Sequence, residues 1–325
     1  MKILLTGANG FVGSHIAKEL TDNNNEVICL IRPTSNLSWL EGLDLSYRKA
    51  SFNNKEELKS CVRDIDIVVH CAGLVRAINK EEYFEVNVEN TKRLCEAVLS
   101  ENPNLKKFIF ISSQAAMGPS KSQNPKSLDE NENPVSDYGL SKLAAEKEIK
   151  KLLSGKIPYT ILRPASVYGP RDKDIFIFFN LVHKHFKPMT LKKRFLQLVF
   201  VEDIAKAVIS ALNNSKSDNK TFFLAQKTPY KWADIAEIIA KGAKKKVFPL
   251  PLPDFAFYIA AFIAENLAKI SKKPAVLNKQ KINEMLQTYW IGDTAPAERD
   301  LGLIFTSLEK GSQKTYNWYM NSKRF

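Results

Sequence analysis

The sequence predicts an α/β fold, a doubly wound parallel sheet with a smaller, mostly helical C-terminal lobe. Three observations lead to this prediction. A glycine-rich turn joins an apolar strand to a helix within the first twenty residues, strand-length apolar runs alternate with helical patterns to about residue 225, and helical patterns dominate beyond Tyr230. Alternating strands and helices build parallel sheets covered on both faces. We therefore expect ligands at the carboxyl edge of the sheet.

The glycine-rich turn follows the first strand, Lys2 to Leu5, and precedes apolar residues at helical spacing. Gly7 permits a sharp turn, Gly10 lets a pyrophosphate approach the backbone, and Gly13 lets helix and strand pack closely. The free N–H groups at the helix start attract an anion. An ordinary glycine-rich turn is the alternative, but the placement favours a Rossmann-type dinucleotide site. The expected cofactor contacts here are Gly7, Asn9, Gly10, Phe11, Val12 and Gly13.

The second strand, Glu26 to Ile31, ends at Arg32. In dinucleotide folds this position faces the adenosine ribose, where an acidic residue binds the 2′-hydroxyl of NAD and an arginine accommodates the 2′-phosphate of NADP. Arg32 therefore predicts a preference for NADP(H), with NAD(H) as the other possible cofactor. An exposed loop arginine without a ligand is the alternative.

Three further strands are expected at Leu45 to Lys49, Ile65 to His70 and Lys106 to Ile111. Small residues follow the second of them, so that backbone and cofactor can approach, and hydroxyl and amide side chains follow the third. Helices are expected from about Lys55 to Cys61 and from Tyr83 to Leu99, the latter containing Asn87. The strand ends add Cys71, Ala72, Gly73, Ile111, Ser112, Ser113 and Gln114 to the candidate site.

A polar loop, Gly118 to Asp137, leads into a helix from Tyr138 to about Leu153, whose first turn places Tyr138 and Lys142 one turn apart on one face. A tyrosine titrates near about 10, so it needs a neighbouring cation to act as a base at neutral pH. A serine hydroxyl at a strand end can then hold the substrate oxygen. The pattern YxxxK is common by chance, and it gains weight here from the preceding glycine turn and Ser112-Ser113.

The remaining chain supports two regions. A strand at Tyr159 to Leu162, another at Phe195 to Val201, a helix at Asp203 to Leu212 and a strand at Phe222 to Ala225 continue the alternation. We expect a dinucleotide-binding domain at 1–170, to which 196–225 return, and a substrate-binding lobe at 171–195 and 226–325. Aromatic residues of the lobe either pack between its helices, which we favour, or line an apolar pocket: Phe176, Phe178, Phe179, Phe255, Phe257 and Phe262.

Composition limits the other functions. The net charge of +13 comes with basic clusters at Lys184 to Arg194, Lys241 to Lys246 and around Lys269 to Lys281. We interpret them as a solvated basic surface rather than a nucleic-acid site. The four cysteines are scattered singly and predict neither a disulfide nor a metal site. The longest apolar run, Phe255 to Ala264, is shorter than the roughly 20 residues of a membrane span. Since Met1 runs straight into the first strand, we expect a cytoplasmic protein without stable membrane insertion.

Several motifs together make the chain resemble an extended short-chain dehydrogenase/reductase, a family that includes nucleotide-sugar epimerases and dehydratases. They occur in family order over about Met1 to Ala225, and the last hundred residues match loosely. The matching segments are Thr6 to Gly13, His70 to Gly73, Asn87-Val88, Ser112-Ser113, Tyr138 to Lys142, Arg163-Pro164, Val167 to Arg171 and Val201 to Ala205.

The resemblance implies roles for individual residues. Tyr138 would be the catalytic acid/base, Lys142 its partner and a contact of the nicotinamide ribose, and Ser113 the hydroxyl that orients the substrate. Asn87 would brace the cofactor pocket; a helix-surface asparagine and, for the serines, a plain strand cap are the alternatives. Where many relatives have an acidic residue at the adenine, this chain has Ser51 and Phe52. Further expected contacts are Pro164, Ala165 and Val167 for the cofactor, and Gln114 and Arg171 for the substrate.

The reaction has three candidate outcomes. We favour an NAD(P)-dependent oxidoreductase that interconverts a secondary alcohol and a ketone, because uncharged residues such as Gln197 precede Val201-Glu202-Asp203, as in the dihydroflavonol reductase and 3β-hydroxysteroid dehydrogenase branch that the sequence resembles. A nucleotide-sugar epimerase or dehydratase with tightly bound NAD is the alternative. A non-catalytic NADP(H)-sensing regulator is the third, against which the intact serine, tyrosine and lysine argue. By analogy, a homodimer through the helices holding Asn87 and Tyr138 is expected.

Overall fold

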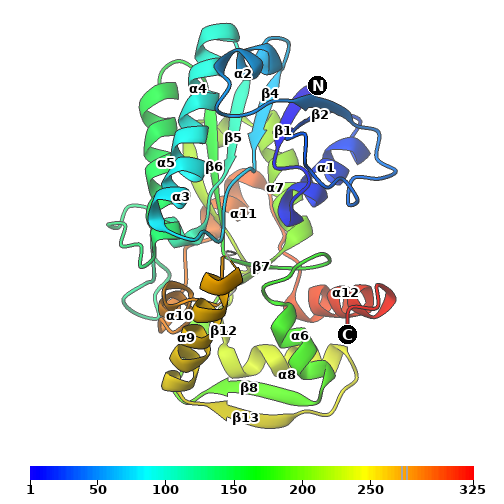
Figure 1. The fold of residues 1–325 in the computed structure, drawn as a ribbon, viewed down its shortest axis with the longest axis vertical. Coiled ribbons are helices and arrows are strands. Elements are labelled where there is room, and N and C mark those ends of the chain that lie inside the picture. Colours follow the sequence, from blue (N-terminus) through cyan, green and yellow to red (C-terminus); the bar gives the residue numbers. More distant parts are fainter. Residues whose placement is uncertain (272–273, 276) are drawn as a thin grey trace.

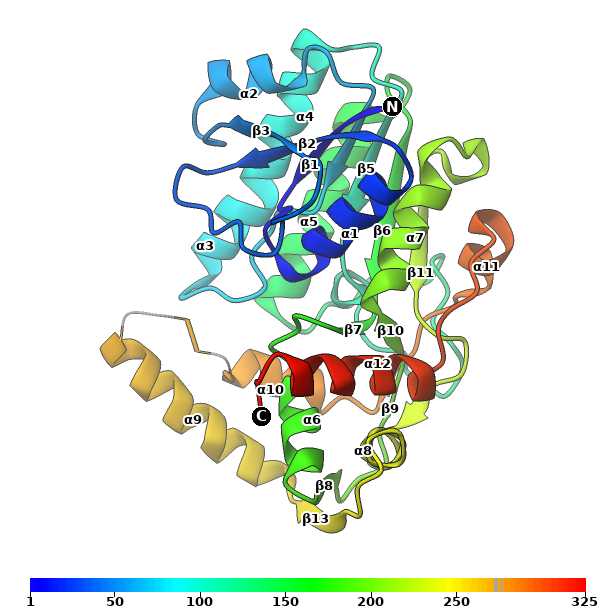
Figure 2. The ribbon, with the colours of Figure 1, turned by 90° about the vertical axis from the view of Figure 1, so that its right-hand side faces the viewer.

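The computed structural model describes residues 1–271, 274–275 and 277–325. Its centre is a seven-stranded sheet in the order β11-β6-β5-β4-β1-β2-β3, shown in Figures 1 and 2. All neighbouring strands are parallel, so their carboxyl ends meet at one edge. The strands are β1 (Lys2–Thr6), β2 (Glu26–Ile31), β3 (Ser46–Lys49), β4 (Ile67–His70), β5 (Lys107–Ile111), β6 (Tyr159–Pro164) and β11 (Lys220–Leu224). The predicted doubly wound parallel sheet is confirmed.

Helices cover both faces of the sheet, because successive strand residues point to opposite sides. On β1, Ile3 and Leu5 join the core under one helical layer, whereas Leu4 joins the core under the other. The first layer comprises α1 (Phe11–Asp22), α7 (Val201–Leu212) and α11 (Ala295–Leu301). The second comprises α2 (Lys55–Val62), α4 (Asn90–Glu101) and α5 (Asp137–Leu153).

The helix expected from Tyr83 to Leu99 is not continuous. It is α3 (Lys80–Phe84), a single π-helical turn (Glu85–Glu89), and then α4. A π turn accommodates one residue more than an α-helical turn, and such turns often occur at functional sites. Asn87 lies in this turn and is buried, which also excludes the alternative of a helix-surface asparagine.

The lobe below the sheet is built around an aromatic core formed by α6 (Phe176–His183), α8 (Trp232–Gly242) and α12 (Leu308–Asn321). Two strands that the sequence did not indicate, β8 (Phe186–Thr190) and β13 (Phe248–Leu252), pair in parallel at its lower end (Figure 1). The lobe also contains α9 (Asp254–Ser271) and α10 (Lys279–Met285). Short strands connect it to the sheet region, namely β7 (Ser166–Tyr168), β9 (Phe195–Leu196), β10 (Leu198–Phe200), β12 (Tyr230–Lys231) and β14 (Tyr289–Trp290).

The strand expected from Phe195 to Val201 is therefore divided between β9 and β10, which belong to different sheets. The break is at Gln197, whose backbone N–H donates to the carbonyl of Trp290 at 3.0 Å. Its side-chain Oε1 accepts a hydrogen bond from the N–H of Gly292 at 2.8 Å. These contacts to a segment almost a hundred residues away fix the break, and Val201 begins α7 instead of ending a strand.

The aromatic residues of the lobe behave in two ways. Phe178 and Phe179 are buried and Phe257 contacts the ring of Trp232, as expected for packing between helices. Phe255 and Phe262 are 65% and 68% exposed, so the packing interpretation is wrong for these two. Both belong to α9.

Three further expectations concern composition. All four cysteines are free thiols, in agreement with their scattered spacing. No helix in the described ranges is both long enough and apolar enough to cross a membrane. Lys272 and Lys273, from the third basic cluster, lie outside the described residues.

Candidate functional site at the carboxyl edge of the sheet

The glycine turn after β1 forms a cradle at the start of α1. Gly7 has a φ of 71°, and a Cβ on it would lie 2.7 Å from the backbone nitrogen of Ala72. A Cβ on Gly13 would lie 2.0 Å from the carbonyl oxygen of Gly7, so a side chain at either position would displace backbone. The helix cap, Gly10, provides no side-chain hydrogen bond, and the first turn has no acidic residue. The first-turn N–H groups are thus available to an anion, which fits the pyrophosphate of a dinucleotide.

Two candidate residues for the adenosine end are exposed at the neighbouring strand ends. Arg32 follows β2, and its backbone N–H donates to Ser35 Oγ at 3.1 Å. After β3, the N–H of Ser51 donates to Glu57 Oε2 at 2.8 Å. Glu57 comes from the first turn of α2 and brings a carboxylate to the place where the sequence has no acidic residue. Sequence reasoning missed it because only this hydrogen bond reveals the proximity.

Ser113, Tyr138 and Lys142 lie together where β5 and α5 meet. The side chain of Ser113 is close enough to the Tyr138 phenol to favour the phenolate by hydrogen bonding. Ser113 Oγ also accepts a 3.1 Å hydrogen bond from the N–H of Ala115, so its hydroxyl is left with a donor role. Lys142 Nζ donates to the carbonyl oxygen of Ile111 at 2.8 Å and lies 4.1 Å from the centre of the Phe110 ring. The structure therefore brings the three predicted catalytic residues into one cluster.

Burial dominates the electrostatics of this cluster. It raises the pKa of Tyr138 above that of a free tyrosine, although the Ser113 hydrogen bond acts in the opposite direction. It lowers the pKa of Lys142 to about 8. The sequence suggested that the lysine would lower the pKa of the tyrosine, whereas the main influence on that pKa in the structure is desolvation, which raises it. The positive charge of an oxidised nicotinamide would add to the stabilisation of the phenolate.

Asn87 fastens the π turn to the neighbouring loop and to α5. Its Oδ1 accepts from the N–H of Leu74 at 2.7 Å, and its Nδ2 donates to the carbonyl of Leu74 at 3.0 Å and to Ser141 Oγ at 2.9 Å. A Cβ on Gly73 would lie 3.0 Å from Asn87 Oδ1 and 3.7 Å from Lys142 Nζ. The glycine thus keeps space beside the lysine, in the segment that also contains Cys71 and Ala72.

Ser112 and Ser113 have different surroundings. Ser112 is buried and its Oγ donates to Glu146 Oε1. The same carboxylate is paired with the buried Arg163, whose Nε and Nη2 donate at 2.9 and 2.6 Å. This geometry assigns Ser112 to an internal network and leaves Ser113 beside Tyr138. Gln114 directly follows Ser113 in the chain and is buried in a 3-10 turn.

Residues 170–175, between β7 and α6, connect three parts of the dinucleotide region. The carbonyl of Pro170 is 2.9 Å from His15 Nε2 on α1. The guanidinium of Arg171 lies 5.9 Å from the ring of Trp39, which follows β2, and Asp174 forms an ion pair with Arg76, which follows β4. We call this segment the 170–175 strap. It was not evident from sequence because each partner is more than 90 residues away.

Arg171 has two unusual features within the strap. It adopts a positive φ of 77°, which non-glycine residues rarely do. Its Nη1 atom is buried and has no hydrogen-bond partner among the described residues. An unsatisfied guanidinium nitrogen suits an anionic group such as a phosphate.

The predicted cofactor contacts Pro164, Ala165 and Val167 lie at the other side of the site, at the end of β6 and the start of β7. The N–H of Ala165 is bonded to the carbonyl of Leu224 at 3.0 Å.

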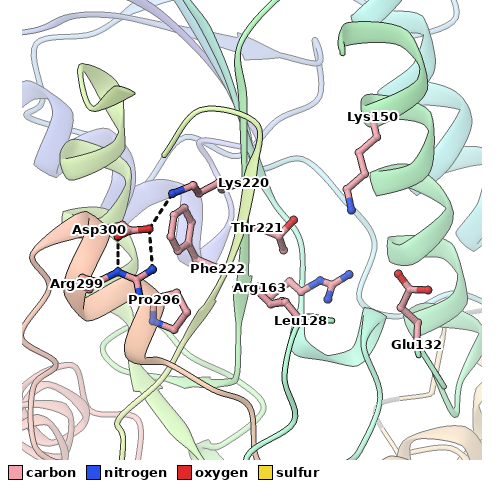
Figure 3. Close-up of a pocket in the computed structure, with 10 residues that line it drawn as sticks. All are labelled: Leu128, Glu132, Lys150, Arg163, Lys220, Thr221, Phe222, Pro296, Arg299 and Asp300. Atoms are coloured by element: carbon pink, nitrogen blue, oxygen red, sulfur yellow. Dashed lines mark hydrogen bonds and ion pairs between the residues drawn. The ribbon is translucent and has the colours of Figure 1, made fainter. Parts of the chain in front are cut away.

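A separate pocket lies along the edge strand β11 and α11 (Figure 3). In it, Lys220 and Arg299 both contact Asp300, at 3.0 and 2.7 Å. Ser113, Tyr138 and Lys142 are not among its lining residues. The pocket is therefore distinct from the candidate site at the carboxyl edge.

The doubly wound sheet and its glycine cradle define a dinucleotide-binding protein of the Rossmann type. Comparison with known proteins identifies its family. Residues 3–225 match the model of the NAD dependent epimerase/dehydratase family. The chain belongs to this family of enzymes, which confirms the resemblance noted in the sequence.

Individual relatives agree with this assignment. The chain is 29% identical to UDP-glucose 4-epimerase of Vibrio cholerae over 269 residues, 78% of this chain and 80% of the relative. It is 23% identical to ceramide reductase of Caulobacter vibrioides over 320 residues, 98% of this chain and 94% of the relative. The structure of Thermotoga maritima UDP-glucose 4-epimerase with UDP-glucose superposes with a TM-score of 0.81 and 21% identity, covering 99% of this chain and 100% of that one.

Proposed function

We propose that the protein is a nucleotide-sugar epimerase or dehydratase that keeps its nicotinamide dinucleotide bound through the reaction. The observation that carries the proposal is the Ser113–Tyr138–Lys142 cluster at the carboxyl edge, in a chain of the epimerase/dehydratase family. The Vibrio cholerae relative supports this outcome over the simple alcohol oxidoreductase that we favoured from the sequence.

In this proposal Tyr138 removes the proton from a sugar hydroxyl. Ser113 holds the same oxygen through its free proton, and Lys142 stabilises the tyrosine anion by its charge. A dinucleotide held at Gly7, Gly10 and Gly13 would supply a reversible acceptor for the hydride of the sugar carbon. An epimerase turns the resulting ketone over before the hydride returns, and Tyr138 then gives the proton back. A dehydratase eliminates water between the two hydride transfers.

The 170–175 strap supports a retained cofactor. It links α1, whose start fits a pyrophosphate, to the segments after β2 and β4, through His15, Trp39 and Arg76. Arg171 offers here a guanidinium nitrogen, Nη1, that has no hydrogen-bond partner among the described residues. An enzyme that regenerates its cofactor in each cycle has no need to release it, so contacts that tie α1 to the segments after β2 and β4 suit that reaction.

The test begins with the protein as purified. Denaturation and chromatography of the supernatant should release close to one dinucleotide per chain. Incubation with UDP-glucose, UDP-glucuronic acid or dTDP-glucose, followed by NMR, should yield an epimer or a dehydrated sugar without net consumption of cofactor, and Tyr138→Phe should abolish the product. A protein that turns over no nucleotide sugar and requires stoichiometric added NADPH contradicts the proposal.

A second candidate is a net reductase that prefers NADP(H). Two observations favour it, the exposed Arg32 at the end of β2 and the nearly full-length alignment with ceramide reductase. In this case the ketone is the substrate, Tyr138 donates the proton, and the oxidised cofactor leaves. Adding ketones and NADPH to the same screen decides between the two, because only the reductase shows ketone-dependent loss of NADPH absorbance.

A further inference from the structure

The helix α9 exposes a continuous apolar stripe. Its large exposed residues are spaced by three or four positions, so they lie on one face of the helix. Phe255, Ile259, Phe262, Ile263 and Leu267 are each more than half exposed, and Tyr258 is 40% exposed. Single exposed apolar residues are ordinary, whereas a contiguous set marks an interaction surface or a liability.

The opposite face of α9 attaches the helix to the lobe. Phe257 packs at 6.3 Å against the ring of Trp232, and Ala261 is buried. Arg194 binds Asp254 at the helix start at 2.8 Å. Tyr258, at the margin of the stripe, adds a hydrogen bond from its Oη to Asn283 at 3.1 Å. The apolar stripe therefore belongs to an anchored helix, which extends from the lower end of the lobe away from α8 (Figure 2).

β13, which precedes α9 in the chain, and its partner β8 also carry exposed apolar residues. β13 ends at Leu252, two residues before α9 begins. Phe248 on β13, Phe186 on β8 and Leu191 immediately after β8 are all exposed. We define the docking surface as these three residues together with the exposed stripe of α9.

Exposed lysines lie next to β8 and β13 in the sequence. Lys184 precedes β8, Lys193 follows it, and Lys244 and Lys246 precede β13. All four are exposed and form no ion pair within the described part of the chain. Exposed apolar side chains next to unpaired lysines are the combination by which peripheral helices bind the interface of anionic membranes.

We propose that the docking surface binds the headgroup region of an anionic lipid bilayer, with α9 lying parallel to the membrane plane. A second copy of the chain fits less well, because a symmetric interface would bring two sets of lysines together in a protein of net charge +13. The helix lies on the membrane rather than across it, in agreement with its length and with the charged Asp254 and Glu265 in its sequence. This inference does not depend on the substrate of the catalytic site.

The test measures flotation of the full-length protein with vesicles. Vesicles of phosphatidylcholine alone are compared with vesicles that contain about 30% phosphatidylglycerol, at low and high salt. The protein should float with the anionic vesicles, and added salt should weaken the binding because it screens the lysines. Phe262→Glu should lower the partition coefficient about tenfold or more, since it places a charge in the stripe. Lys244→Glu with Lys246→Glu should reduce binding to anionic vesicles only.

Ile304→Glu is the matched control, because Ile304 is 91% exposed and lies outside the docking surface. It should float like the unchanged protein, and thermal melting should show that all variants fold. Failure of the unchanged protein to float, or equal losses for Phe262→Glu and Ile304→Glu, would overturn the proposal. A dimer in sedimentation velocity that Phe262→Glu dissociates, without vesicle binding, would show that a second copy covers the helix instead.

Discussion

Lys142 Nζ donates a 2.8 Å hydrogen bond to the carbonyl oxygen of Ile111, the last residue of β5. The contact ties the first turns of α5 to the carboxyl edge of the sheet, one turn from Tyr138. A buried amine with a single strong acceptor is held in place, but its charge is poorly solvated, which is why the pKa falls to about 8.

The first prediction concerns stability and pH. Since the pKa of Lys142 is lower in the folded protein than the 10.5 of an unfolded chain, the buried charge destabilises the fold below about pH 8. Stability should therefore rise from pH 8 towards 10.5 as the folded state loses this proton first. Lys142→Met should raise Tm at pH 7 and lose this advantage at high pH, as measured by calorimetry. An equal gain at pH 7 and pH 10.5 would contradict the shift.

The second prediction concerns the acid/base. Tyr138→Phe removes the phenol and keeps the ring that lies 6.1 Å from Tyr83. We expect a loss of about 10²–10⁴-fold in kcat, the range for removal of a general acid/base. Cofactor affinity, measured by fluorescence titration, should stay within about twofold. Tyr83→Phe is the matched control and should retain most of the activity; equal losses in both variants would refute the role of Tyr138.

The third prediction separates the two cofactors. Arg32→Asp should weaken NADP(H) binding by about tenfold or more, equivalent to about 1.4 kcal/mol, and should improve NAD(H) binding. Lys49→Asp makes the same charge change at the end of β3, where the residue is also exposed. If both variants change NADP(H) affinity equally, Arg32 acts only through general charge. Isothermal titration with each cofactor provides the measurement.

The fourth prediction tests the 170–175 strap. Arg76→Ala and Asp174→Ala each break the ion pair across it and should speed dinucleotide release about tenfold. The double variant should be no faster than either single one, because the pair is one interaction. Asp22→Ala, which breaks the exposed Lys18–Asp22 pair on α1, is the control. Stopped-flow displacement measures the rate of dinucleotide release. If the accelerations caused by the two single variants simply added in the double variant, the result would count against the strap.

The fifth prediction concerns the buried pair behind Ser112. Arg163→Met leaves Glu146 charged and unpaired in the interior, which costs about 3–5 kcal/mol in the free energy of unfolding. Combining it with Glu146→Leu removes the stranded charge and should recover much of that loss. Urea unfolding of the single and double variants measures both quantities. A double variant as unstable as Arg163→Met alone would argue against this explanation.

The sequence was sufficient for the sheet, since apolar runs and glycine turns are local signals. It also placed Ser113, Tyr138 and Lys142 at adjoining strand and helix ends, which the topology then brings together. It missed Glu57 beside Ser51 and the pair between Arg76 and Asp174. Each of those contacts joins segments that come together only in the folded chain. No local sequence pattern therefore indicates them.

Two errors have specific physical causes. The predicted strand from Phe195 to Val201 is divided at Gln197 by hydrogen bonds to Trp290 and Gly292. No sequence pattern around Gln197 predicts these bonds. The packing prediction fails for Phe255 and Phe262 of α9 because exposed and buried apolar residues have the same sequence signal. The domain boundaries and the homodimer stay predictions.

The π turn around Asn87 has a consequence for how the chain tolerates change. Each residue added to a helix rotates the remainder of that helix by about 100° and advances it by about 1.5 Å. Deleting Val86 should let α3 and α4 merge into one regular helix, and either Asn87 or the whole of α4 must then rotate. Asn87 would lose its hydrogen bonds to Leu74 and Ser141 together, although no polar side chain had been replaced. Sequence length in this segment is therefore as strict a requirement as residue identity, and a single-codon deletion is a more severe lesion there than most substitutions.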